Sequence, residues 1–161
     1  MIRTPLMTLL CCAVLVGAEP AFAVDTTPAM PTTAEVEKLA PARALITEGK
    51  HREAIDALRG VNDTASADWN NLMGLSHRKA PAADLAAAER YYDAALRIDP
   101  KHRGALEYSG ELYLMMGNLP RAEARVDALN KLCFFGCDEL KKLREAIAAY
   151  KANGNKHVVR P

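Results

Sequence analysis

The chain has 161 residues, of which 50% are hydrophobic and 25% are charged, and its formal net charge is +1 at pH 7. A chain of this length can form one domain with a hydrophobic core of its own. The 21 basic and 20 acidic residues nearly balance. This balance lacks the positive excess that binding to nucleic acid or to an anionic membrane needs, so neither is expected as the main partner.

The first residues are typical of a secretory signal peptide. Arg3 gives a positive start, an apolar run covers residues 6–17, and the small residues Ala21 and Ala23 flank Phe22 at the expected cleavage site. The run is far shorter than the roughly 20 residues that span a bilayer. We therefore expect a signal peptide over residues 1–23, cleavage after Ala23, and a mature chain that is periplasmic or secreted without membrane insertion.

The mature chain is expected to begin with a flexible linker over residues 24–33, where Pro28 and Pro31 stand among several threonines. From Ala34 onward the sequence is rich in helix-forming residues, and its apolar residues recur at helical spacing. The predicted fold class is therefore all-α over residues 34–152. Residues 154–161 are expected to form a disordered tail.

A period of 34 residues runs through the helical part. Three alanines mark it: Ala54, Ala88 and Ala122. Each is followed four positions later by a bulky apolar residue: Leu58, Tyr92 and Val126. Gly49 and Gly117, two periods apart, are each placed to end a helix before a short turn. Gly74 and Gly110 are 36 residues apart, and we expect the two extra residues in the turn at 80–83.

These residues resemble the tetratricopeptide family, whose unit is a 34-residue helical hairpin with small residues at fixed contact points. The resemblance covers residues 35 to about 150, although Pro41 falls inside the first expected helix. Three segments are similar to an exported proteobacterial subgroup of the family: residues 77–79, 102–105 and 132–137. The resemblance implies a solenoid of about three helical hairpins, and a capping helix is expected at about 137–153.

Two cysteines follow the third hairpin, Cys133 and Cys137, on either side of Phe134-Phe135-Gly136. In an oxidising compartment this arrangement predicts a disulfide that joins the last repeat to the capping helix. Two alternatives stay open. A redox-active pair would lack the usual Cys-x-x-Cys spacing, and a soft-metal site would lack a nearby histidine to complete its ligand shell.

The sequence contains no recognisable catalytic constellation. The four histidines are scattered, with no pair four residues apart on one helix, and Gly49-Lys50 lacks the flanking residues of a phosphate-binding loop. We therefore expect no enzymatic activity, no catalytic residues, no cofactor and no metal.

In the tetratricopeptide fold the first helix of each hairpin lines a concave groove in which peptides or partner helices dock. With the glycines in register, eight residues are expected to face this groove: Asn71, Leu75, Arg78, Lys79, Glu107, Glu111, Leu114 and Met115. Asparagine can hold a peptide backbone, and charged side chains can orient it. Glu107 and Glu111 depart from the basic clamp by which some family members hold a terminal carboxylate.

The expected function is that of a periplasmic protein–protein interaction scaffold that binds a peptide or helix of a protein partner in the groove. One alternative is a redox or metal-handling protein that uses Cys133 and Cys137. The other is an architectural subunit of an envelope complex that uses the convex face. The partner's identity is not encoded in any motif of the sequence.

Overall fold

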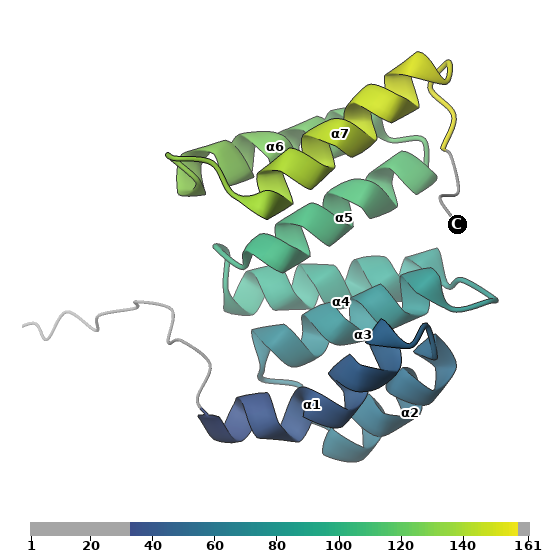
Figure 1. Ribbon diagram of the computed structural model, residues 1–161, viewed down its shortest axis with the longest axis vertical. Coiled ribbons are helices and arrows are strands. Elements are labelled where there is room, and N and C mark those ends of the chain that lie inside the picture. The colour runs from purple at the N-terminus through teal and green to yellow at the C-terminus, as the bar shows by residue number, and fades with distance from the viewer. Residues whose placement is uncertain (1–32, 158–161) are drawn as a thin grey trace, which may run out of the picture.

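The computed structural model describes residues 33–157, which form seven α-helices (Figure 1). The helices are α1 (Thr33–Thr47), α2 (His51–Val61), α3 (Ala67–Lys79), α4 (Leu85–Ile98), α5 (Arg103–Met115), α6 (Leu119–Leu132) and α7 (Asp138–Ala152). The all-α prediction is therefore confirmed. The predicted signal peptide with its cleavage site, nearly all of the predicted linker and the last four residues of the tail lie outside the described residues.

The helices pack as sequential pairs, α1 with α2, α3 with α4 and α5 with α6, and α7 packs against both α5 and α6. Figure 1 shows these pairs stacked along the long axis of the molecule. The odd-numbered helices α1, α3, α5 and α7 each pack against the next odd-numbered helix, whereas the backbones of α2, α4 and α6 stay apart from one another within residues 33–157. Helix α6 reaches α4 through side chains, in the ion pairs Arg121–Glu89 and Arg125–Asp93. The odd-numbered helices therefore form the closer, inner layer of a curved array.

The 34-residue period corresponds to one recurring contact position. Ala54, Ala88 and Ala122 are each the fourth residue of an even-numbered helix, and all three are 0% exposed. At the next marker, Leu58 and Tyr92 are also fully buried, and Val126 is partly buried against the core. The period therefore marks a recurring buried position on each outer helix.

The helix ends repeat as well. Gly49 and Gly117 both have a positive φ, and each turn closes with the same two backbone hydrogen bonds, from the glycine and from the residue after it. The loops between α1 and α2 and between α5 and α6 have three residues, whereas the loop between α3 and α4 has five. The two extra residues therefore lie where the sequence predicts them.

Glycine also permits close helix packing at two equivalent positions. Gly74 and Gly110 are each the eighth residue of their helix. A Cβ on Gly74 would lie 2.7 Å from the ring of Tyr92 in the same hairpin, and a Cβ on Gly110 would lie 2.6 Å from the side chain of Leu143 in α7. The eighth residue of the helix therefore permits close packing within one hairpin at Gly74, and close packing between α5 and α7 at Gly110.

Helix α7 closes the array, as the sequence predicts. Its buried residues, Leu140, Leu143, Ile147 and Tyr150, form an apolar stripe along one face. At the opposite end, α1 continues through Pro41, which is exposed, while Leu39 and Ala42 on the other face are buried against α2 and α3. The departure of the first repeat from the 34-residue pattern therefore does not prevent a first hairpin.

Candidate functional site

A buried ion pair joins α3 and α5 in the inner layer. The Nη2 atom of Arg78 lies 2.7 Å from Oε2 of Glu111, and the two side chains are 4% and 28% exposed. The guanidinium of Arg78 also lies over the ring of Tyr108, 5.7 Å from its centroid. Removing either charge would leave the other unpaired in a poorly solvated place. The pair therefore holds α3 and α5 at a fixed spacing.

The polar residues of α3 and α5 follow one register. Arg78 pairs with Glu111, and seven residues earlier on each helix the Nδ2 atom of Asn71 lies 3.2 Å from where a Cβ on Gly104 would stand. The equal offset at two points means that α3 and α5 run side by side in the same direction. Because residues three or four apart share a helix face, Glu107 lies on the same face of α5 as Gly104 and Glu111.

A cleft of about 480 Å³ opens at the carboxyl ends of α3 and α5, and we call it the inner cleft. Its walls are Arg78, Lys79, Ala80, Pro81, Ala83, Glu111, Leu114, Met115, Ala146, Ala149, Tyr150 and His157. The two alanines of α7, Ala146 and Ala149, leave space that larger side chains would fill. The volume lies within the range of ligand-binding sites, and the mixture of apolar walls with a few polar groups is typical of such sites.

The structure divides the eight predicted groove residues into two groups. Five of them line the inner cleft: Arg78, Lys79, Glu111, Leu114 and Met115. The other three, Asn71, Leu75 and Glu107, are buried along α3 and α5 and do not belong to the cleft lining. Their part in partner binding stays a prediction for all eight.

Two of these buried residues have unmet hydrogen-bonding capacity. Within residues 33–157, the Oδ1 atom of Asn71 is sealed from solvent without a hydrogen-bond partner. Glu107 is 3% exposed, and its carboxyl accepts no hydrogen bond and forms no ion pair in the described part of the chain. Burial raises the pKa of Glu107 to about 7; attraction by Lys142 opposes this rise, and repulsion by Glu111 reinforces it.

Sequence reasoning assigns α7 the role of a cap, whereas the structure also places it in the cleft wall. Ala146, Ala149 and Tyr150 of α7 line the inner cleft, and His157 of the following segment contributes to it. Figure 1 shows the segment after α7 turning back toward the end of α5. Burial lowers the pKa of His157. The small residues spaced three apart on α7 were the available signal for a cavity on that face.

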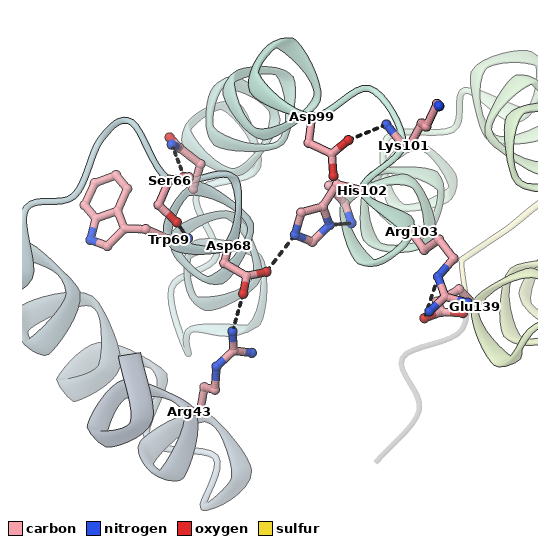
Figure 2. Close-up of polar contacts among 11 residues, drawn as sticks. Arg43, Ser66, Asp68, Trp69, Asp99, Lys101, His102, Arg103 and Glu139 are labelled. Atoms are coloured by element: carbon pink, nitrogen blue, oxygen red, sulfur yellow. Dashed lines mark hydrogen bonds and ion pairs between the residues drawn. The ribbon is translucent and has the colours of Figure 1, made fainter. Parts of the chain in front are cut away.

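A polar network holds the other end of the inner layer together. Figure 2 shows Asp68 of α3 between Arg43 of α1 and His102, the residue that caps α5. Asp68 accepts hydrogen bonds from Arg43 at 2.7 Å and from His102 Nε2 at 2.8 Å. The His102 Nδ1 atom accepts the backbone N–H of Ala105, which leaves the ring proton on Nε2. The hydrogen bond from His102 is the main reason that the pKa of Asp68 is lowered.

The predicted disulfide between Cys133 and Cys137 is present, with a Cα–Cα distance of 5.6 Å. It closes the loop between α6 and α7 and presents Phe134 and Phe135 to solvent, where they are 88% and 97% exposed. The bridge joins the last repeat to α7, as expected from the sequence. A disulfide is typical of proteins in an oxidising compartment.

Within the described part of the chain, no helix is long and apolar enough to cross a membrane. Among the same residues, no group of three or more histidine, cysteine, aspartate or glutamate side chains is arranged to hold a metal ion.

Comparison with known proteins finds no matching family model, no matching curated protein and no matching solved structure.

Proposed function

We propose that this chain is an exported interaction scaffold of the tetratricopeptide type, which binds a segment of one protein partner in the inner cleft and is not an enzyme. The 34-residue period, the stacked hairpins and the repeated glycine turns support the family assignment. The disulfide, together with the signal-like start of the sequence, supports a periplasmic or secreted location.

The observation that carries the binding proposal is the inner cleft itself. It combines a solvent-facing hollow with apolar walls from Leu114, Met115 and Tyr150 and with the buried Arg78–Glu111 pair. Apolar side chains of a partner would bury surface against these walls, and the fixed charges would orient its polar groups.

The test is affinity capture from an envelope extract with two matched variants of the tagged mature chain. Ala149→Gln places a longer side chain in the cleft, whereas Ala148→Gln changes a neighbouring exposed alanine of the same helix. We expect one protein to be enriched by the parent and by Ala148→Gln and lost from Ala149→Gln. Equal capture by all three folded chains would contradict binding in the cleft.

A further inference from the structure

A buried acceptor of the inner layer, Glu107, defines the chemistry of the segment that binds there. Resting on the proposed function, we infer that the partner presents a basic side chain, lysine or arginine, whose cationic head pairs with Glu107. Glu107 lies on the line of contact between α3 and α5, which we call the seam. It is about one helical turn from Glu111, a residue of the cleft wall.

Asn71 and Glu107 are buried polar residues whose side-chain oxygens lack hydrogen-bond partners in the described part of the chain. Asn71 is 6% exposed and its Oδ1 atom has no hydrogen-bond partner among residues 33–157, although nearly all buried polar atoms in folded proteins have one. Glu107 is 3% exposed and unpaired in the same part of the chain. Oδ1 of Asn71 is sealed from solvent and lies out of a ligand's reach, which leaves the carboxylate of Glu107, an acceptor, as the group that a ligand's donors can satisfy.

A ligand can reach Glu107. Its carboxyl oxygens do not belong to the side-chain atoms that are sealed from solvent, in contrast to Oδ1 of Asn71. Glu107 lies on the face of α5 that also carries Glu111 and Leu114, two residues of the cleft wall. A segment seated in the inner cleft and extended along the seam would therefore pass over Glu107.

The charges around Glu107 favour a cationic partner group. The charged groups that act on Glu107 are Glu111 on its own helix, Arg78 on α3, and Lys142 and Glu139 on α7. Arg78 is already engaged by Glu111 at 2.7 Å, and Lys142 is exposed and forms no ion pair with Glu107 in the described structure. Burial raises the pKa of Glu107 to about 7 in spite of the attraction by Lys142 and Arg78. A cationic side chain would supply the missing compensation, whereas a partner's carboxylate would be repelled.

The experiment is selection of a phage-displayed library of random peptides on the immobilised mature chain, in parallel with Glu107→Gln. Glutamine has the same shape as glutamate and no charge. Glu139→Gln is the matched control, because Glu139 is a second glutamate near Glu107 that sits 3.8 Å from Arg103. We expect lysine or arginine at one position of the peptides enriched on the parent, and at least tenfold weaker binding of those peptides to Glu107→Gln but not to Glu139→Gln.

The pH dependence gives a second readout. With a pKa of about 7, the ionised fraction of Glu107 rises about tenfold between pH 6 and pH 8. The affinity of the selected peptides for the parent should rise by about the same factor, and their affinity for Glu107→Gln should stay constant. Peptides without a basic residue that bind all three chains equally would overturn the inference and leave the cleft as a binding site. Failure to enrich any peptide would also overturn it, whereas the capture experiment tests the cleft independently.

Discussion

Replacing Glu107 with glutamine is expected to stabilise the folded protein at neutral pH and to have little effect in acid. Burial raises the pKa of the Glu107 carboxyl from 4.5 to about 7, so the folded state holds this proton more tightly than the unfolded state does. The stabilisation that results is complete below pH 4.5 and is lost as the pH rises through about 7. Glutamine carries no charge at any pH and therefore avoids this loss.

The size of the effect follows from the pKa difference. At about 1.36 kcal/mol for each pKa unit, the rise from 4.5 to about 7 corresponds to an upper limit of about 3 kcal/mol. The carboxyl oxygens of Glu107 keep some contact with water. We therefore expect Glu107→Gln to exceed the parent by about 2 kcal/mol in free energy of unfolding at pH 8, and to equal it near pH 4.5.

Urea unfolding followed by circular dichroism at several pH values between 4.5 and 8 measures this difference directly. Other titrating groups are shared by both chains, so their contributions cancel in the comparison. Glu145→Gln, a change at an exposed glutamate of α7, should stay within about 0.5 kcal/mol of the parent throughout. A Glu107→Gln chain that is less stable than the parent at pH 8 would show that Glu107 is paired in the folded protein and would contradict this prediction.

Three further predictions concern the scaffold. Gly74→Ala should lower the free energy of unfolding by about 1–3 kcal/mol, because the new Cβ would lie 2.7 Å from a tyrosine ring. Gly60→Ala has open space around the new Cβ and should raise the free energy of unfolding by about 0.5–1 kcal/mol through its higher helix propensity. Urea unfolding of both variants distinguishes the packing effect from the helix-propensity effect. Cys133→Ser, which removes the disulfide, should lower stability by about 2 kcal/mol, and a reducing agent should then have no further effect on melting. Asp68→Asn should destabilise by about 1–3 kcal/mol at pH 7. The difference in stability between Asp68→Asn and the parent should shrink in acid. The hydrogen bond from His102 lowers the pKa of Asp68, so the stabilisation from the ionised carboxylate is lost as the pH falls through that lowered pKa. Thermal unfolding of both chains at pH 7 and pH 3 checks this prediction.

The repeat was predictable because each hairpin of a stacked array needs the same kinds of residue at the same positions. Where two helices meet closely, only a small residue fits, so Ala54, Ala88 and Ala122 recur at one spacing and are fully buried. Where a helix must reverse within three residues, a positive φ is needed, which Gly49 and Gly117 supply. Local rules of this kind can be read directly from the sequence.

The site was only partly predictable because its properties arise where three helices meet. A glutamate in a helix is ordinarily exposed, and no local signal shows that α3, α5 and α7 bury Glu107. The contribution of α7 to the cleft was missed for a related reason, since α7 follows the last complete period and carries none of its markers. The Asp68–His102 bond was not predicted either, because it joins the start of α3 to the cap of α5 and neither residue carries a local signal for the other.

Photo-crosslinking in cells tests most directly whether the inner cleft is the working surface. A photoreactive amino acid would replace Met115, a partly exposed residue of the cleft wall, or Arg97, an exposed residue of the outer helix α4. We expect position 115 to crosslink to one discrete partner protein and position 97 not to crosslink to it. Crosslinking of the same partner from position 97 alone would contradict it and would place the working surface on the outer helices.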